Sequence, residues 1–306
     1  MRCTRPMTVG FQPDGKTLCW SKNHFSKEYP TFQLPCGKCI SCRLEYSRQW
    51  AVRCVHEAQM HPENSFITLT YEKLKSEKLD YTDFQKFMKR LRKSLNQPVG
   101  CFVTGEYGEK NKRPHWHAII FNWRPTDCIY KYSNDRGDKI YSSSSLDSLW
   151  DHGITEVGSV TFESAGYCAR YAAKKLVHGS DQSHEFHPIS KKSSKHAIGK
   201  KFLERYWENI FNLGSIVLPN GETCAIPRYY EKWLKQHQPA AWQAYTTKLK
   251  LDRQQEAERI ETKKKQEEYL INLNRPAGSG PQISRDRARE KILEQKFENL
   301  QKHLKL

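Results

Sequence analysis

Two histidines and a glutamate occupy positions from which they could bind one metal ion. His115 and His117 lie two apart in a run of β-forming residues, and Glu106 follows a similar run at 101–105. The polar, glycine-containing turn between the runs predicts a β-hairpin. Residues two apart on a strand share a face, so both imidazoles lie opposite Trp116, and a closed hairpin brings Glu106 to the imidazole face. Such a trio forms an open site for a divalent ion, Mg²⁺ or Mn²⁺, with room for water or a phosphate oxygen. The alternative is a half-buried sheet edge without a metal.

The segment 163–177 predicts a helix with two different faces. At about 100° per residue, Tyr167, Tyr171 and Lys174 form one stripe. The opposite, apolar stripe, which can anchor the helix, consists of Ala165, Ala169, Ala172 and Leu176. The alternative is an aromatic pair that only stabilises the helix, with Lys174 as a solvated charge.

A phenol has a pKa of about 10 and is a poor nucleophile at neutral pH. A metal that polarises a phosphate and a cation that neutralises the developing charge make it effective. Attack on a DNA phosphodiester would give a phosphotyrosine bond that conserves the bond energy for rejoining. Two tyrosines one helical turn apart would allow one to hold the first DNA end while the other cleaves again.

Cysteines near the N-terminus have the spacing of a second metal site. Cys36, Cys39 and Cys42 are separated by two residues each, and Gly37 permits a tight turn between them. A closed structural Zn²⁺ site needs a fourth ligand, for which Cys3, Cys19 and His24 are candidates. An iron–sulfur cluster and reduced cysteines without a metal are the alternatives, and zinc is favoured because no Cys-Pro pair follows.

The composition indicates a polyanionic partner. The 306 residues have a formal net charge of +17 and a pI near 9.4, which favours nucleic acid over a membrane. No apolar stretch approaches the roughly 18 residues of a membrane-spanning helix, and no signal peptide is recognisable, so we expect a cytosolic protein with reduced cysteines. A basic helix face and the hairpin turn are expected to contact DNA phosphates. These residues are Lys86, Lys89, Arg90, Arg92, Lys93 and Arg113.

Hydrophobic periodicity predicts an α+β fold. Strands at 66–71, 101–105, 116–121 and 154–161 alternate with helices at 82–95 and 145–150, and a polar, serine-rich connection spans 130–145. The βαββαβ order is that of ferredoxin-like folds, an antiparallel sheet with helices on one face. The open face would then carry Glu106, His115 and His117.

Three regions are expected along the chain. Residues 1–60 form a cysteine-rich segment, 61–235 the catalytic domain, and 236–306 a charged helical tail that is solvated or partly disordered. Between 178 and 201 a basic loop could hold single strands, and an unordered surface loop is the equally open alternative. Asn220-Gly221 predicts a hairpin turn.

The motifs together resemble a known family. His115-Trp-His117 followed by Tyr167-x-x-x-Tyr171-x-x-Lys174 is similar to the two-tyrosine HUH endonucleases. The cysteine run, the strand FITLTY and the later IPRYYEK resemble the replication initiators of small single-stranded DNA phages, the gokushovirus group of microviruses. The resemblance covers roughly residues 1–235, and its cysteine and tyrosine motifs are the specific ones.

The resemblance implies an activity and partners. It implies nicking of origin DNA, a covalent 5′-phosphotyrosine, rolling-circle synthesis by host polymerase and circularisation of the displaced strand in the host bacterial cytoplasm. The phage origin DNA, single-stranded and replicative form, would be the substrate. A host helicase would unwind it, because the chain has no helicase-type phosphate loop. His115, His117 and Glu106 would be metal ligands, Tyr167 and Tyr171 nucleophiles, and Lys174 a phosphate contact.

Two other interpretations stay open at this point. A two-tyrosine transposase would have the same catalytic residues and would differ in the N-terminal cysteines and the DNA site. A non-catalytic, zinc-stabilised nucleic-acid-binding protein would explain the charge and the cysteines but not the tyrosine stripe. It predicts that changing Tyr167 and Tyr171 together to Phe has no effect.

Overall fold

The computed structural model describes residues 3–72, 79–108, 113–134, 137–174, 189–193, 197–276 and 284–303. The chain forms two compact units, Tyr46–Arg259 on the one hand and Met1–Glu45 with Ile260–Leu306 on the other. The expected regions 1–60, 61–235 and 236–306 stay a prediction. The strands and helices of each unit are described separately below.

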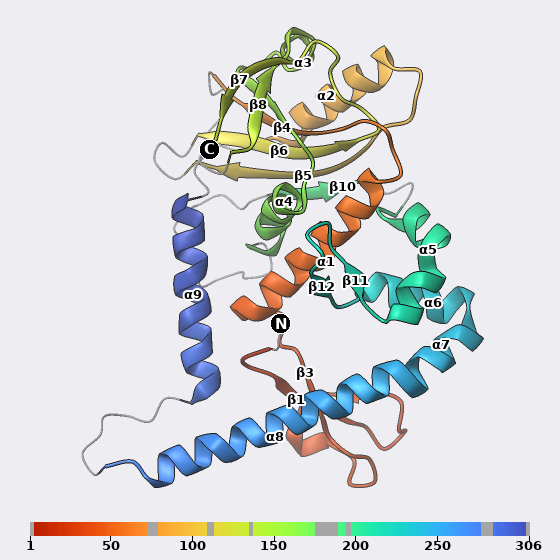
Figure 1. Ribbon diagram of the computed structural model, residues 1–306, viewed down its shortest axis with the longest axis vertical. Helices are drawn as coiled ribbons and strands as arrows, with labels where there is room; N and C mark the ends of the chain where they lie inside the picture. Colours follow the sequence, from red (N-terminus) through yellow and green to blue (C-terminus); the bar gives the residue numbers. More distant parts are fainter. Residues whose placement is uncertain are drawn as a thin grey trace. The chain divides into compact units, whose positions relative to one another are not determined.

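The larger unit is built on a seven-stranded sheet in the order β10-β5-β6-β4-β9-β8-β7 (Figure 1). Its central strands β5-β6-β4-β9 are antiparallel to their neighbours. Apart from the hairpin β7–β8, which is inserted between β6 and α3, the chain order is β4, α2, β5, β6, α3 and β9, so the predicted ferredoxin-like core is confirmed. The strands are β4 (Asn64–Thr70), β5 (Gly100–Tyr107), β6 (Pro114–Phe121), β7 (Ile129–Ser133), β8 (Lys139–Ser142), β9 (Thr155–Gly158) and β10 (Ile189–Lys192).

One face of this sheet is covered by two helices that the sequence predicted. Asp80 caps α2 (Tyr81–Ser94) by accepting a hydrogen bond from the Thr82 amide, and Ser143 caps α3 (Ser144–Leu149) in the same way at Leu146. Apolar side chains of both helices pack with the sheet residues that point away from the histidines. This core includes Phe84, Phe87, Leu91, Leu146, Ile67, Leu69 and Trp116.

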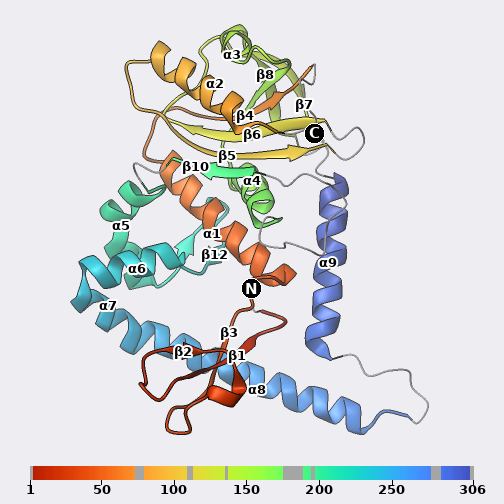
Figure 2. The ribbon, with the colours of Figure 1, turned by 180° about the vertical axis from the view of Figure 1, so that it is seen from behind.

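The expectation that the other face is open was wrong. The helix α4 (Phe162–Lys174) contacts β5 and β6 on that face, and Trp50 of α1 (Ile40–Ala58) stacks on Phe102 of β5 with ring centroids 5.2 Å apart. Figures 1 and 2 show α4 and the second half of α1 on the same side of the sheet, opposite α2. The physical reason lies in the strands themselves. Six consecutive residues of β5 are buried, and because successive residues point to opposite faces, both faces of the sheet must be covered by other elements.

The polar connection predicted at 130–145 was also wrong. The segment contains the hairpin β7–β8 at the edge of the sheet. The turn includes Gly137 with φ +82°, a backbone conformation that suits glycine. Most side chains of the hairpin are exposed, and Ile140 is the buried apolar residue of β8, so hydrophobic alternation was too weak to indicate strands.

A second apolar cluster joins the later elements to α1 in the same unit. It contains Leu203, Phe211, Tyr230, Trp233 and Tyr245, with Trp242 packed against it. The elements that follow β10 are α5 (Lys200–Leu213), the predicted hairpin β11 (Ile216–Val217) and β12 (Thr223–Cys224), α6 (Arg228–His237), α7 (Pro239–Tyr245), η2 (Thr246–Lys250) and α8 (Leu251–Leu273). The tail expected from residue 236 therefore begins with packed residues.

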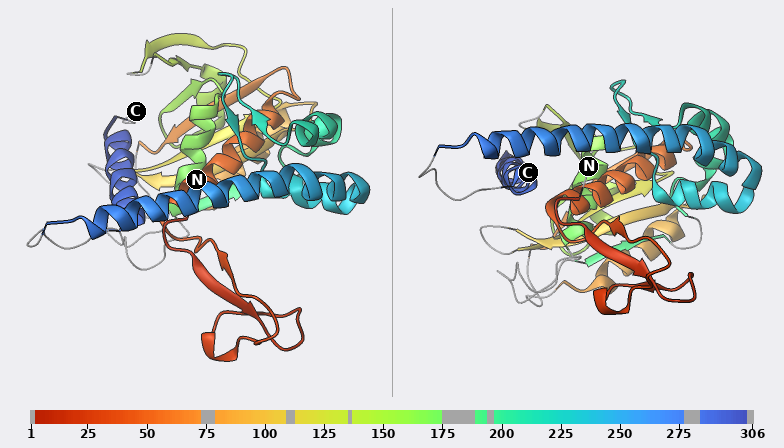
Figure 3. Two further views of the ribbon diagram at one scale, coloured as in Figure 1. Left: turned by 60° about the horizontal axis from the view of Figure 1, so that its bottom comes forward. Right: turned by 90° about the horizontal axis from the view of Figure 1, so that it is seen from below.

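The smaller unit contains a three-stranded antiparallel sheet in the order β2-β1-β3 (Figure 3). Its strands are β1 (Met7–Phe11), β2 (Leu18–Cys19) and β3 (Phe32–Leu34), followed by the start of α1, and a short helix η1 (Lys22–His24) lies between β2 and β3. The C-terminal helix α9 (Arg285–His303) belongs to the same unit. Its Glu290 is buried and binds Thr4 and Arg5. In the described parts of the chain, no helix has both the length and the apolar character needed to span a bilayer.

Candidate active site

The strand pair β5–β6 brings the predicted metal ligands together. Glu106 lies directly opposite His115, and Thr104 lies opposite His117. Opposite and alternate residues of an antiparallel pair share one face. The Nε2 atoms of both histidines lie 2.9 Å from Oε1 of Glu106. The predicted trio is therefore a real spatial cluster, with all three ligand atoms within 4.8 Å of one another.

Neighbouring groups orient the two imidazoles. Nδ1 of His115 lies 3.1 Å from the carbonyl oxygen of Arg113, so the nitrogen that carries the proton there is Nδ1. Nδ1 of His117 lies 3.1 Å from the Thr68 hydroxyl of the adjacent strand β4. Both Nε2 atoms consequently point to the same place, as metal-binding histidines with a supporting partner do.

Burial and charge shape the protonation of this cluster. Burial by itself raises the pKa of Glu106, but hydrogen bonds from His115 and His117 outweigh it and lower this pKa to about 2. For His115, burial lowers the pKa, and the bond to Glu106 outweighs it, so the pKa is raised. Burial lowers the pKa of His117. Glu106 is therefore a carboxylate at neutral pH, the form that binds a cation.

The residues present fit a divalent metal ion. The buried Oε2 atom of Glu106 has no hydrogen-bond partner among the described residues, although buried carboxylate oxygens are normally satisfied. Two imidazole nitrogens and one carboxylate are ligands of divalent ions, and a set of three leaves coordination positions open for water or a substrate. An ion bound by Glu106, His115 and His117 would satisfy that oxygen.

The helix α4 places Tyr167 against the same cluster. The helix starts with reciprocal hydrogen bonds between Thr161 and Ser164, and its Ala165 and Ala169, on the opposite stripe, are completely buried. The Tyr167 hydroxyl donates to Oε1 of Glu106 at 2.9 Å and lies 3.4 Å from Nε2 of His117. The phenol thus lies beside the candidate metal ligands, as the functional interpretation of the stripe requires.

The other two members of the tyrosine stripe are only partly described. Tyr171 and Lys174 belong to the last turn of α4, but their side chains lie outside the described residues. Arg170, between them and Tyr167, has its guanidinium carbon 5.7 Å from the centre of the Tyr167 ring. This cation was not singled out from the sequence, because it is not on the predicted stripe.

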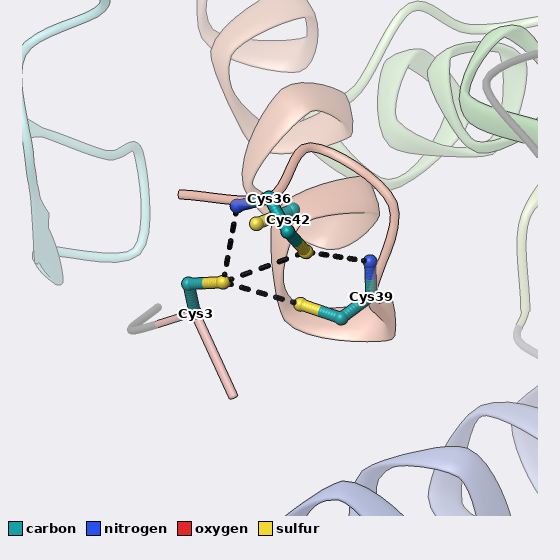
Figure 4. Close-up of side chains that lie close together, drawn as sticks. All are labelled: Cys3, Cys36, Cys39 and Cys42. Atoms are coloured by element: carbon teal, nitrogen blue, oxygen red, sulfur yellow. Dashed lines mark hydrogen bonds between the residues drawn. The ribbon is translucent and has the colours of Figure 1, made fainter. Parts of the chain in front are cut away.

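The four-cysteine cluster of the smaller unit is a second candidate metal site (Figure 4). The Sγ atom of Cys3 lies 3.6 Å from that of Cys36 and 3.7 Å from that of Cys39, and Cys42 completes the group. Cys3 is therefore the fourth member, whereas Cys19 instead donates to the carbonyl of Ser21 at 3.4 Å. Among the described residues, neither Cys19 nor His24 joins this group.

Hydrogen bonds reach the sulfurs of Cys36 and Cys39, whereas burial raises the pKa of the Cys3 and Cys42 thiols. The amides of Lys38 and Cys39 donate to Sγ of Cys36 at 3.4 and 3.3 Å, in a turn that Gly37 makes with φ +74°. Burial raises the pKa of the Cys39 thiol, but hydrogen bonding with Thr4 and Cys42 outweighs it and lowers the pKa to about 6. Four thiols converging on one point suit a closed tetrahedral Zn²⁺ site.

The predicted DNA contacts lie on the other side of the sheet from Tyr167, with one exception in the hairpin turn. Lys86, Lys89, Arg92 and Lys93 are carried by α2, the helix on that side. Arg90 is less available, because it pairs with Asp151 at 2.9 Å and donates to the Leu149 carbonyl. Arg113 is exposed at the hairpin turn beside His115. The structure leaves the role of these residues a prediction.

Two supporting residues were missed in the sequence. Thr68 lies directly opposite His117 in the β4–β6 register, and alternation along the predicted strand 66–71 would have placed it on the histidine face. Glu290 lies 285 residues from Arg5 in sequence, and no local pattern indicates such a contact.

Comparison with known proteins gives the family. The family model for the replication-associated protein ORF2 matches residues 64–176, which include every residue of the metal and tyrosine cluster. Replication-associated protein VP4 of Bdellovibrio phage phiMH2K is 46% identical over 316 aligned residues, covering 100% of both chains. The chain belongs to this family of replication-associated proteins of Microviridae-type phages.

Two more distant relatives are also replication-associated proteins of phages or viruses. Replication-associated protein ORF4 of Chlamydia phage 1 is 36% identical over 69% of this chain and 56% of its own. Replication-associated protein ORF2 of Spiroplasma virus 4 is 29% identical over 76% of this chain and 80% of its own. No solved structure matches the chain.

Proposed function

We propose that this phage replication protein is a rolling-circle initiator, a metal-dependent nuclease of the HUH type that cleaves and rejoins origin DNA through tyrosine. The observation that carries the proposal is the position of the Tyr167 hydroxyl, 2.9 Å from Glu106 and 3.4 Å from His117. This phenol lies beside the two-histidine, one-carboxylate cluster, where a metal-bound phosphate would be within its reach.

The cluster supports an attack on a phosphodiester. A divalent ion held by Glu106, His115 and His117 would supply Lewis-acid polarisation of the scissile phosphate. Tyr167 attacks the phosphorus through its hydroxyl oxygen, which forms the new P–O bond while the bond to the 3′ oxygen breaks. The phenolic proton leaves to solvent, and the 3′ end is released as a hydroxyl. One ester replaces another, so no nucleotide is consumed.

Tyr171 and Lys174 would complete the cycle in this proposal. Tyr171 follows Tyr167 by one helical turn in α4, the spacing at which residues share a helix face. One tyrosine would hold the 5′ end while the other cleaves the regenerated origin. Lys174 would contact the phosphate. A host polymerase and helicase would extend and unwind the DNA in the host bacterial cytoplasm, and Zn²⁺ would stabilise the four-cysteine cluster.

A denaturing gel tests the proposal. Purified protein is mixed with single-stranded DNA that carries the phage origin, in Mn²⁺, and the gel is examined for a protein–DNA adduct. We expect an adduct that disappears in the double variant Tyr167→Phe, Tyr171→Phe. The matched control is Tyr130→Phe, an exposed tyrosine on the edge strand β7, which should keep it. An adduct that survives in the double variant would disprove the assignment of the nucleophiles.

A further inference from the structure

Two cations, Arg53 and Lys192, lie on the active-site side of the sheet, and neither has an acidic partner in the described part of the chain. The guanidinium carbon of Arg53, on α1, lies 4.2 Å from the centre of the Trp50 ring and 4.2 Å from that of Tyr229. The Lys192 ammonium, on β10, lies 4.4 Å from the same Trp50 ring. The second half of α1 and the strand β10 lie side by side in both views (Figures 1 and 2).

Among the described residues, Arg53 and Lys192 form no ion pair, and the polar contact of Arg53 is a donation to the Ile198 carbonyl at 3.0 Å. The nearby Glu57 is already occupied, because Gly199 and His61 contact its two oxygens. Burial lowers the pKa of Arg53, and burial and the charge of Arg53 lower that of Lys192. Two positive charges held beside one indole repel each other, and an anion bound to both would be stabilised by each of them.

The pair is placed along the strand that carries Glu106. Lys192 lies opposite Phe102 of β5, and Phe102 stacks on Trp50. Phe102 is four residues from Glu106 on the same face, or about 13 Å at the usual rise of a strand. Trp50 is only 7% exposed, so it cannot stack with a base. The groups at this place that can bind a ligand are therefore the charges of Arg53 and Lys192.

A groove leads from Lys192, one member of this pair, toward the basic helix α2. It has a volume of about 710 Å³ and is lined by Lys192 and Lys201 as well as by Lys89 and Arg92 of α2. Glu57 is the one carboxylate in its lining among the described residues. The groove therefore passes the β5–β10 edge and connects cations on the two sides of the sheet, which explains how one DNA strand could contact both.

We infer that Arg53 and Lys192 form a phosphate-binding site for the DNA strand, separate from the metal cluster, from which the strand continues through the groove to Lys201, Lys89 and Arg92. The inference rests on the proposed function for its ligand, a single DNA strand. Its role is positioning, since Phe102, beside the pair, is about 13 Å along β5 from Glu106, and the pair takes no part in bond making. Non-covalent binding therefore tests it independently of cleavage.

The test measures how binding of a fluorescent oligothymidine depends on salt, without added metal. Each phosphate contact with a single strand contributes about 0.7 to the slope of log K against log salt. Lys192→Gln should lower the slope by about 0.7 and weaken binding about fivefold at about 0.1 M salt. Arg53→Lys keeps the charge and should keep most of the slope. The matched control is Lys139→Gln, an exposed lysine on β8, five strands from β10, which should change neither quantity.

Three results would overturn the inference. One is an equal loss in Lys192→Gln and Lys139→Gln, which would mean that any surface cation acts alike. Another is an unchanged slope in Lys192→Gln. The third is that inorganic phosphate, added at constant ionic strength, competes with the oligothymidine, and that Lys192→Gln abolishes this competition but leaves the salt slope of DNA binding unchanged. The pair would then be a binding pocket for small anions. If the wild-type protein formed no covalent adduct with origin DNA while Lys192→Gln still lowered the salt slope of binding, the proposed function alone would be refuted.

Discussion

One prediction concerns the rise in Tm that a bound metal ion causes and its dependence on the ligand His117. A ligand that binds only the folded state at about 100 times its Kd stabilises it by about 2.7 kcal/mol. For a unit of the size of Tyr46–Arg259, each kcal/mol raises Tm by about 2–4 °C. Saturating Mn²⁺ should therefore raise the Tm of the wild-type protein by about 5–11 °C.

Changing His117 to Gln removes one of the three ligands with little change in volume. Loss of even a supporting group can cost about 100-fold in metal affinity. The same Mn²⁺ concentration then lies near or below the Kd and adds at most about 0.4 kcal/mol, or roughly 1–2 °C. Thr68→Val, which removes the hydroxyl beside Nδ1 of His117, should give an intermediate shift.

The assay is thermal unfolding with and without Mn²⁺, followed by intrinsic fluorescence. His61→Gln is the matched control, because His61 is a partly buried histidine outside the cluster and should keep the full shift. A full Mn²⁺ shift in His117→Gln, or its loss in His61→Gln, would refute the assignment of the metal ligands.

Three further predictions concern the cysteine cluster and the protonation of Glu106. Purified Cys3→Ser should lose its zinc and Cys19→Ser should retain it, as measured by elemental analysis; the reverse result would contradict the cluster seen here. Glu290→Ala removes the carboxylate that binds Thr4 and Arg5, at a cost of about 1–3 kcal/mol, so zinc release to a chelator should be faster than in the exposed control Glu298→Ala. Equal release rates would argue against this contact. In metal-free protein, ionised Glu106 stabilises the fold above its unfolded pKa of about 4.5, and this contribution is lost as pH falls toward its folded pKa of about 2. The Tm advantage of the wild type over Glu106→Gln should thus shrink between pH of about 5 and about 2.5, and a constant difference would contradict the lowered pKa.

The core of the fold and the candidate metal site were predictable because they depend on local periodicity. Alternation along a strand fixes which side chains share a face, so His115, His117 and Glu106 could be grouped before their distances were known. Helical periodicity likewise placed Tyr167 on one stripe of α4. These inferences need only the element type and the chemistry of the side chains.

What could not be predicted depends on contacts between distant segments. Cys3 is 33 residues from Cys36, and its spacing does not distinguish it from Cys19 as a fourth ligand. Arg53 and Lys192 are brought together only by the packing of α1 against the edge of the sheet. The burial of Tyr245 likewise needs a partner surface that no local pattern reveals.

The most direct test of the central claim is to map the covalent bond. Wild-type protein is incubated with origin single strands and Mn²⁺ for one turnover, digested with nuclease and protease, and the peptides are analysed by mass spectrometry. The proposal predicts a nucleotide attached to the α4 peptide, on Tyr167, with Tyr171 modified after the second cleavage. A nucleotide on a residue outside α4, or cleaved DNA without any attached peptide, would contradict it.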